Sequence, residues 1–372
     1  MDDLHTPCYL TDARLLQKNT ALLKQIQQRT GCKILLAQKA FSMFSAYPLI
    51  RDDLAGTTAS GLFEAKLGRE HFGKEVHVFS PAYTQEDFTQ LLELCDHIVF
   101  NSFGQWKKYR QQVQDATRNI SCGIRINPGY AEVETDLYNP CISGSRMGVP
   151  LEQMEDDFAG LDGIHFHTMC EQNSDVLERT LDHMLPQFDK WLKRCKWVNF
   201  GGGHHITRPD YDVERLVRCI ERVRDTYGVQ VYLEPGEAVA LNAGYLVATV
   251  LDVVHNGMDI AILDASAACH MPDVLEMPYR PHILYSGTAG EKTHTYRLAG
   301  NTCLAGDVIG DYSFDHQLQA GEKLVFCDMA IYSMVKNNTF NGVPLPDIAL
   351  YQNGHIDLVK RFGYADFEGR LS

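Results

Sequence analysis

Short apolar runs alternate with longer amphipathic stretches through the first two thirds of the chain. Each run has the length of a buried strand, and the stretches between most runs repeat apolar residues at the spacing of a helix face. This alternation predicts an α/β unit in which strands and helices follow one another. The eight expected strands are Lys33–Lys39, Leu54–Ser60, Glu75–Ser80, His97–Asn101, Ser121–Asn127, Gly163–His167, Trp197–Gly201 and Gln230–Glu234.

The expected α/β span covers about 200 residues, which is close to the lower size limit of a (β/α)8 barrel. A TIM barrel is therefore the expected fold. A doubly wound open sheet is the competing architecture, because periodicity does not show whether a sheet closes. Asp12 is expected to cap a first helix over Ala13–Arg29, after an extended piece at Thr6–Leu10. The later expected helices are Phe63–His71, Gln85–Leu94, Phe103–Val113, Val176–Cys195 and Val213–Tyr227.

The pattern changes after Gly244, where short strands follow one another without long helices between them. This change predicts a mostly antiparallel β domain over residues 244–372, joined by the N-terminal strand 1–13, beside a barrel domain over 14–243. Asn353-Gly354 is a strong signal for a hairpin turn between the last two strands. The expected strands are Tyr245–Val253, Asp259–Leu263, His282–Tyr285, Thr293–Leu298, Lys323–Phe326, Ile348–Leu350 and Ile356–Val359.

The composition narrows the classes of partner and compartment. A formal net charge of -14 argues against nucleic acid, which requires a basic surface, and it is compatible with a cationic ligand. Eleven cysteines without close pairs fit a reducing compartment better than a disulfide framework. The acidic N-terminus lacks the apolar segment of a secretory signal, and the longest apolar stretch, 238–254, is interrupted by polar residues and glycine. We therefore expect a cytoplasmic protein without a membrane partner.

Polar residues or glycines stand at the end of every expected barrel strand. In an α/β barrel these ends surround the active site. A lysine lodged there among apolar neighbours loses hydration, which lowers its pKa and makes its amine a nucleophile, for example toward an aldehyde cofactor. Taken alone, a lysine at a strand end is more often an exposed cap. The eight ends are Lys39, Ser60, Ser80, Asn101, Asn127, His167, Gly201-Gly202-Gly203 and Glu234.

Two of these strand ends carry further chemistry. The backbone N–H groups of Gly201-Gly202-Gly203 could approach a phosphate closely, although a tight turn explains the glycines equally well. Glu234 precedes Pro235-Gly236, and a carboxylate held there could pair with the ring nitrogen of pyridoxal phosphate. Without such a partner, Glu234 is an ordinary acid at the end of a strand.

His165 and His167 alternate along the sixth expected strand, and we expect them to point to opposite faces, so that one of them enters a shared pocket. This orientation argues against a clamp of two histidines on a metal ion. A metal site is the weaker interpretation also because no known ligand spacing occurs among the nearby Cys170, Glu171, His204 and His205.

Cys303 lies in a glycine-bounded loop, Gly300–Asp307, between two expected β segments. One cysteine among eleven is more often an inert filler than a reactive group. To donate a proton, Cys303 would need partial exposure in the active cleft.

These features together resemble the alanine racemase-like, fold-type III pyridoxal phosphate decarboxylases. The features are a lysine after the first barrel strand, a histidine in G-x-x-F-H, a G-G-G loop, an E-P-G strand end and a late C-x-x-x-D, in this order over nearly the whole chain. Within that group the chain is most similar to the carboxynorspermidine and carboxyspermidine decarboxylases. The segments that carry this similarity are Gln38-Lys39-Ala40, His167–Glu171, Asn199–His205 and Leu233–Glu237.

Glu237 separates this chain from other members of the group. Relatives that decarboxylate diaminopimelate, ornithine or lysine usually carry a basic residue after E-P-G, where this chain has Glu237. The departure favours a substrate with amino groups over one with a second carboxylate at that point.

The resemblance also implies a role for individual residues. It implies that Lys39 carries pyridoxal 5'-phosphate as a Schiff base, that His167 stacks on the cofactor ring and that Glu234 keeps the ring nitrogen protonated. Cys303 resembles the acid that protonates Cα across the interface of a homodimer. The expected phosphate ligands are Gly202, Gly203 and Tyr332; the expected ligands of the substrate's amino groups are Glu237, Asp307 and, more loosely, Asp273; and Ser60 and Glu64 are expected near the lysine.

Three alternatives stay open beside decarboxylation of a carboxylated polyamine. The first is decarboxylation of another basic amino acid, such as diaminopimelate, lysine or ornithine. The second is a non-catalytic homologue that binds polyamine or a partner protein, against which the presence of Lys39 and Cys303 argues. The third is a metal-dependent barrel hydrolase that uses the histidines.

Overall fold

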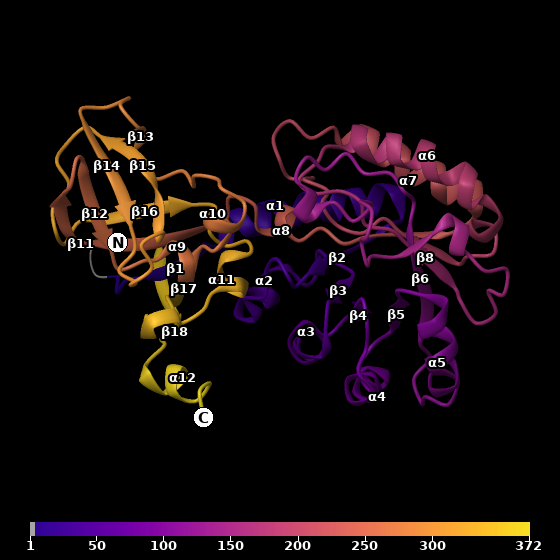
Figure 1. Ribbon diagram of the computed structural model, residues 1–372. Coiled ribbons are helices and arrows are strands. Elements are labelled where there is room, and N and C mark those ends of the chain that lie inside the picture. Colours follow the sequence, from indigo (N-terminus) through magenta and orange to yellow (C-terminus); the bar gives the residue numbers. More distant parts are fainter. Residues whose placement is uncertain (1–3) are drawn as a thin grey trace. The chain divides into compact units, whose positions relative to one another are not determined.

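The structure is a computed structural model that describes residues 4–372, and these residues form two compact units (Figure 1). The barrel unit is Gln17–Val239. The sheet unit joins the described residues up to Leu16 to Ala240–Ser372. Part of the N-terminal segment on which the expectation of no secretory signal depends, residues 1–3, lies outside the described residues.

The barrel unit contains a closed ring of parallel strands. Within residues 4–372, eight strands pair in a circle, and the pairing of β5 with β6 closes it. This closure confirms the expected (β/α)8 barrel and rules out the open doubly wound sheet. The strands are β2 (Lys33–Ala37), β3 (Gly56–Ala59), β4 (Glu75–Phe79), β5 (His97–Phe100), β6 (Ser121–Asn127), β8 (Gly163–His165), β9 (Trp197–Asn199) and β10 (Gln230–Leu233), with the short β7 (Val149–Pro150) beside β6.

Helices surround these strands (Figure 1). Polar caps fix helix starts: Asp12 Oδ1 accepts from the N–H groups of Arg14 and Leu15, as the sequence predicts, and Asp212 accepts from that of Arg215. The expected helix from Phe63 to His71 is a short α-helix that continues as a π-helical turn, Gly68–Phe72. The main helices are α1 (Ala13–Thr30), α3 (Leu62–Leu67), α4 (Gln85–Leu94), α5 (Phe103–Gln114), α6 (Ser174–Leu192) and α7 (Val213–Tyr227), with the short α2 (Tyr47–Ile50) and α8 (Glu237–Ala240).

Side chains fill the barrel interior, so it is a core and not a pore. Leu35, Val99, Trp197 and Tyr232 pack together there, from four different strands. Two glycines make room for the indole ring: a Cβ built on Gly163 would lie 2.1 Å from Trp197, and one on Gly123 would lie 2.3 Å from it. The interior below the strand ends is therefore fixed by close packing.

The sheet unit is mostly antiparallel, as expected, and β1 lies in it between β11 and β17. Asn353 and Gly354, both with positive φ, form the turn of the expected final hairpin. The strands are β1 (Cys8–Asp12), β11 (Gly244–His255), β12 (Asp259–Leu263), β13 (Gly287–Thr288), β14 (His294–Ala299), β15 (Val308–Phe314), β16 (Lys323–Cys327), β17 (Asp347–Gln352) and β18 (His355–Lys360), and the short helices are α9 (Ala267–His270), α10 (Asp273–Glu276), α11 (Ser333–Lys336) and α12 (Tyr364–Glu368).

One predicted strand of the sheet unit is wrong, and two observed strands were not predicted. The expected strand His282–Tyr285 is reduced to an isolated bridge between Ile283 and Phe326, because Pro281 precedes it and Tyr285 adopts a positive φ of 64°. The strands β13 and β15 were not expected: β13 has only two residues, and Gly310 and Asp311 interrupt the apolar pattern of β15.

Two further observations concern the whole described chain. All eleven cysteines are free thiols, and no disulfide framework was expected from the sequence. Among residues 4–372, no helix is long and apolar enough to cross a membrane.

Candidate active site

A cavity of about 280 Å³ opens at the carboxyl ends of the barrel strands. Lys39 lies two residues after the end of β2 and lines this cavity. Because parallel strands in a barrel all point the same way, side chains that end different strands meet here. The charged and polar residues that line it include Lys39, Ser60, Arg125, His165, His167 and Glu234.

The amine of Lys39 faces the cavity without an ion pair. Its side chain is open to the cavity, yet protein surrounds it, and it forms no hydrogen bond with any described residue. Burial lowers the pKa of Lys39, and the positive charge of Arg125 lowers it further, against the opposing effect of Glu234 and Glu237. A larger fraction of neutral, nucleophilic amine is the consequence.

Glu234 is a buried carboxylate with its orientation fixed by two neighbours. Asn199 Nδ2 donates to Glu234 Oε1 at 2.7 Å, and His165 Nε2 lies 3.4 Å from Oε2. Burial raises the pKa of Glu234, but His165, Asn199 and the more distant His77 outweigh it and lower the pKa to about 2. Glu234 therefore stays ionised next to the cavity at neutral pH, which suits it to bind a cation there.

His167 lies in the same cavity and is oriented by the glycine turn. The backbone N–H of Gly202 donates to His167 Nδ1 at 3.3 Å, which leaves Nε2 as the protonated nitrogen of a neutral ring. Burial lowers the pKa of His167 well below its usual value, and the positive charges of Lys39 and Arg125 lower it further. The ring is therefore neutral, a suitable surface for a flat aromatic ligand.

The expectation that His165 and His167 point to opposite faces is wrong. Both side chains line the same cavity, with ring centroids 6.5 Å apart and planes at 80°. The physical reason is the strand period of two, which places residues i and i+2 on the same face. His165 contacts the Glu234 carboxylate, whereas His167 lies against the glycine turn.

Arg125 belongs to the cavity and was not expected there. Its guanidinium lies 4.6 Å from the centre of the Phe79 ring and donates to the backbone oxygen of His167 at 3.1 Å. The sequence does contain a signal: Arg125 interrupts the apolar run of β6 two residues before Asn127, so it shares the inward face of that strand. Arg125 therefore places a second positive charge near the amine of Lys39.

The glycine turn packs tightly against the strand ends. A Cβ on Gly203, which has a φ of 82°, would lie 2.0 Å from the backbone oxygen of Met169. A Cβ on Gly202 would lie 2.6 Å from the backbone oxygen of Glu234. Close packing is therefore enough to explain why glycine occurs at these positions. The binding of a phosphate by Gly202 and Gly203 stays a prediction.

Ser60 and Glu64 lie near the lysine, as expected. Ser60 lines the cavity, and its backbone N–H donates to Glu64 Oε2 at 2.6 Å. Burial raises the pKa of Glu64, while Lys39 is close enough to oppose that shift. The other expected strand ends do not line this cavity: Asn101 and Asn127 line a separate cavity of about 690 Å³, and Ser80 lines neither of these two.

Four expected site residues lie in the sheet unit. Cys303 is exposed in the loop between β14 and β15, and its N–H donates to Asn341 Oδ1 at 2.7 Å. Tyr332 precedes α11 and has a positive φ of 56°. Asp273 forms an ion pair with Lys336.

Asp307 differs from these residues because it is buried and fully paired. Its carboxylate accepts from Ser266 Oγ at 2.8 Å, from Thr302 Oγ1 at 2.6 Å and from the N–H of Ala268 at 3.2 Å. These contacts attach the loop that contains Cys303 to the sheet unit. They favour a structural role for Asp307 over direct contact with a substrate.

Among residues 4–372, three groups of histidines and acids bring their ligand atoms within 4.8 Å of one another. The group in the cavity, His165, His167 and Glu234, also lies near the cations Lys39 and Arg125, which disfavour a metal ion. A second group, Glu171, His205 and Glu237, lies beyond the carboxyl ends of β8, β9 and β10 and does not line the cavity.

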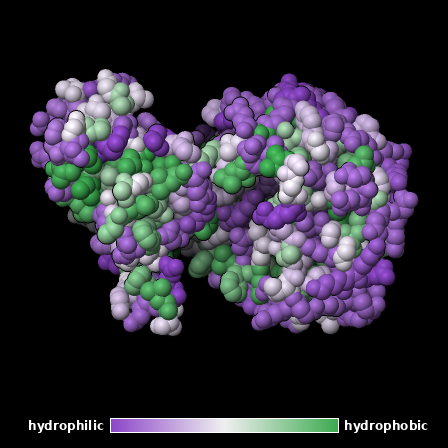
Figure 2. All heavy atoms as spheres, viewed as in Figure 1, coloured by the Kyte–Doolittle hydropathy of each residue, from purple (hydrophilic) through white to green (hydrophobic). Residues whose placement is uncertain are grey.

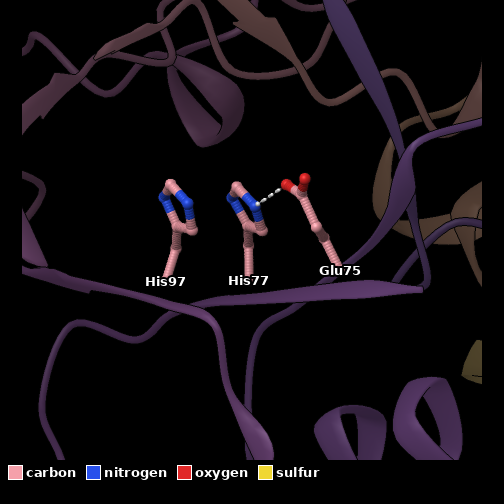
Figure 3. Close-up of side chains that lie close together, drawn as sticks. All are labelled: Glu75, His77 and His97. Atoms are coloured by element: carbon pink, nitrogen blue, oxygen red, sulfur yellow. Dashed lines mark hydrogen bonds and ion pairs between the residues drawn. The ribbon is translucent and has the colours of Figure 1, made fainter. Parts of the chain in front are cut away.

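The remaining group is Glu75, His77 and His97, at the start of β4 and β5 (Figure 3). Figure 3 shows the two imidazoles stacked face to face, with centroids 3.9 Å apart and planes at 7°. Lone pairs in the planes of two parallel rings do not converge on one ion. The amine of Lys33 also donates to Glu75 and neutralises it. This geometry argues against the metal-dependent hydrolase.

Comparison with known proteins agrees with this geometry. The family described as "Pyridoxal-dependent decarboxylase, C-terminal sheet domain" matches residues 8–330. The carboxynorspermidine/carboxyspermidine decarboxylase of Campylobacter jejuni is 42% identical, with 99% of each chain covered. The carboxyaminopropylagmatine decarboxylase of a Synechocystis species is 41% identical, over 100% of this chain and 96% of that one.

Solved structures show the same relationship. The crystal structure of the Campylobacter jejuni carboxynorspermidine decarboxylase, complexed with norspermidine, matches with a TM-score of 0.91 at 41% identity and covers 99% of this chain and 100% of that one. Diaminopimelate decarboxylase from Helicobacter pylori shares the fold, with a TM-score of 0.84 at 18% identity over 99% and 97% of the two chains. The chain therefore belongs to the pyridoxal-dependent decarboxylases, and it is a carbon–carbon lyase of polyamine metabolism that uses pyridoxal phosphate.

Proposed function

We propose that the protein decarboxylates carboxynorspermidine and carboxyspermidine, releasing norspermidine or spermidine and CO2. The observation that carries this choice of substrate is Glu237, which follows Glu234-Pro235-Gly236 and faces His205 and Glu171. A carboxylate at this position attracts an ammonium group and repels the second carboxylate of diaminopimelate.

The cavity residues fit pyridoxal phosphate. When bound, this cofactor supplies an aldehyde for a lysine amine and an electron-accepting ring for the bond that breaks. Lys39 would attach it, because its amine is unpaired and its pKa is lowered. The ionised Glu234 would pair with the ring nitrogen, and the neutral ring of His167 would lie against the cofactor. Gly202, Gly203 and Tyr332 would bind the phosphate.

Arg125 and Glu64 adjust the charge around Lys39. Burial lowers the pKa of the Lys39 amine and the guanidinium of Arg125 lowers it further, which favours reaction of the amine with an aldehyde. Glu64 lies close enough to interact with the same amine, and its own pKa is raised by burial.

Cys303 is the proposed proton donor to the carbon that loses CO2. Its thiol is exposed, as a donor must be, and the buried Asp307 fixes the loop on which it lies. In this step the Sγ proton moves to Cα, and solvent then reprotonates the thiolate. The Cys303→Ala variant should retain the visible absorption of the bound cofactor, and its rate of formation of the decarboxylated polyamine should fall. Full activity of that variant would remove Cys303 from the reaction.

The proposed enzyme is a homodimer in which Cys303 comes from the partner. Figure 2 shows hydrophobic side chains gathered on the visible face of the sheet unit, and Leu358 of the same unit is 50% exposed; such exposure is typical of a surface that associates. Mixing inactive Lys39→Ala and Cys303→Ala subunits should restore about one quarter of the activity, since half of the dimers then contain one intact site. No restoration after subunit exchange would contradict a shared site. The cytoplasmic location stays a prediction.

A CO2-release assay on the holoenzyme tests the proposed substrate. We expect the highest kcat/KM for carboxynorspermidine or carboxyspermidine, and much lower values for diaminopimelate and ornithine. Carboxyaminopropylagmatine belongs in the same assay, because the Synechocystis relative is nearly as similar as that from Campylobacter jejuni. Preference for diaminopimelate would overturn the role of Glu237, and binding without turnover of any substrate would indicate a non-catalytic homologue.

A further inference from the structure

Glu171, His205 and Glu237 form a group beyond the carboxyl ends of β8, β9 and β10 that the cofactor does not explain. Their ligand atoms lie within 4.8 Å of one another, and His205 Nε2 is 3.7 Å from Glu237 Oε2. The three residues come from three separate segments: the loop after β8, the loop after β9 and the start of α8. Their convergence is therefore a property of the folded barrel unit.

His205 is the member of the group that points to a missing ligand. It is 93% buried, since 7% of it is exposed, and neither ring nitrogen has a hydrogen-bond partner among the described residues. Burial lowers the pKa of His205, so the ring is neutral and offers one acceptor nitrogen. An unsatisfied buried imidazole costs free energy unless a ligand supplies the missing hydrogen bond.

Backbone pairing places Glu171 beside this imidazole. The N–H of Gln172 donates to the oxygen of Gly203 at 3.0 Å, and the N–H of His205 donates to the oxygen of Gln172 at 3.2 Å. Glu171 has a positive φ of 53° at the turn just before this pairing. The two loops after β8 and β9 therefore form one rigid edge.

The group has the size and charge of a site for an alkylammonium ion. Three atoms within 4.8 Å of one another share a nearest common point no more than about 2.8 Å from each, so an ammonium nitrogen at or just above their plane lies at the length of a charged N–H···O hydrogen bond from all three. Two carboxylates supply the negative charge, and three acceptors match the three donors of a primary ammonium. Glu237 and Lys39 both follow barrel strands at their carboxyl ends, and Glu237 acts electrostatically on the amine of Lys39, so the group lies on the side of the barrel where the cofactor would be attached.

We propose that Glu171 and His205, together with Glu237, bind the terminal primary ammonium of the polyamine chain. This inference rests on the proposed function and names the group of the substrate that the site distinguishes. Basic amino acids with a shorter chain would leave the imidazole of His205 without a partner. Glu171 and His205 would thus determine specificity without contacting the reacting carbon.

Calorimetric titration of the holoenzyme with two amines tests the proposal. The amines are norspermidine and N-propyl-1,3-diaminopropane, which lacks one terminal amine and keeps the secondary amine. The unchanged protein should bind norspermidine about 10-fold to 100-fold more tightly, the effect of one or two charge-assisted hydrogen bonds. Glu171→Gln and His205→Leu should abolish most of this preference and change the affinity for the N-propyl compound little.

Glu152→Gln is the matched control, because it removes one exposed carboxylate from another barrel loop and should leave the preference intact. The proposal is overturned if both site variants fold and keep the preference. It is also overturned if aminopropylagmatine binds more tightly than norspermidine, or if Zn²⁺ binds stoichiometrically and is lost in His205→Leu while amine binding is unchanged. Failure of the proposed function is a separate result: the unchanged holoenzyme would then neither decarboxylate carboxynorspermidine nor bind norspermidine.

Discussion

Lysine and histidine occur at both ends of the barrel, but they have hydrogen-bond partners at one end and lack them at the other. The floor is the end where the barrel strands begin, and there Lys33 and Tyr232 both donate to Glu75. His77 also donates to Glu75, and its ring stacks on that of His97 (Figure 3). At the mouth, the amine of Lys39 and the imidazole of His205 have no hydrogen bond with described residues.

The difference teaches how stability and function divide within one fold. Polar groups that satisfy one another inside a protein stabilise its core, whereas groups left without partners are available to a ligand. Strand β2 shows the contrast within seven residues, since it begins at Lys33 in the floor and leads to Lys39 at the mouth. The same amine is structural at one end of the barrel and reactive at the other.

The largest expected effect of a substitution is at the mouth. Lys39→Ala should lower kcat by about 10⁴-fold or more, because it removes the amine that attaches the cofactor. Its urea unfolding midpoint should stay near that of the unchanged protein, since Lys39 has no hydrogen bond there to lose. Lys33→Met is the control from the same strand: it should reduce stability and leave the cofactor attached. The prediction is contradicted if Lys33→Met loses the cofactor while Lys39→Ala keeps it and is only less stable.

Glu234→Gln should have the next largest effect, lowering kcat by about 100-fold. The amide keeps the shape of the side chain and loses the charge that would pair with a ring nitrogen. Visible absorption of the bound cofactor, recorded against pH beside kcat, separates loss of binding from loss of chemistry. Unchanged kcat with an unchanged spectrum would contradict the assignment of Glu234.

Glu75→Gln should affect stability and leave the chemistry intact. The substitution removes the charge shared by Lys33, His77 and Tyr232, and we expect it to lower the free energy of unfolding by about 2 kcal/mol. Urea unfolding measures this change, and kcat at a temperature where the variant is folded should match the unchanged protein. A large fall in kcat without a loss of stability would place the floor in the catalytic site.

The smallest expected effect is the dependence of this floor contribution on pH. Burial raises the pKa of Glu75, but His77 and Lys33 outweigh it and lower the pKa from 4.5 to about 2. The ionised group therefore stabilises the fold above about pH 4.5, and this contribution is lost as the pH falls toward 2. The difference in unfolding free energy between unchanged protein and Glu75→Gln should shrink over that interval. A constant difference would mean that the charge of Glu75 is not responsible.

The fold was largely predictable from the sequence, because buried parallel strands leave short apolar runs between amphipathic helices. All eight barrel strands occur where the pattern predicts them, with ends that differ by at most two residues. The sheet unit was harder to predict. Its strand β15 contains Gly310 and Asp311, and a local apolar pattern does not reveal pairing with a distant strand.

The candidate site was predictable where a residue ends a strand and not where loops determine the position. Lys39 and Glu234 follow directly from strand ends, and Arg125 would have followed from the inward face of β6. Glu171 could not be placed beside His205, because a loop-to-loop pairing and a positive φ bring it there. The wrong orientation of His165 arose from applying the strand period incorrectly, since residues two apart share a face.

The contrast between Lys33 and Lys39 gives the most direct test of the central claim, that the lysine at the mouth carries the cofactor. Holoenzyme reduced with borohydride retains pyridoxyl phosphate on the lysine to which it was attached, and peptide mass mapping identifies that residue. We predict the modification on Lys39, with Lys33 unmodified. Modification of Lys33 or of any lysine away from the cavity, or a colourless protein that contains stoichiometric zinc and no pyridoxyl group, would contradict the account.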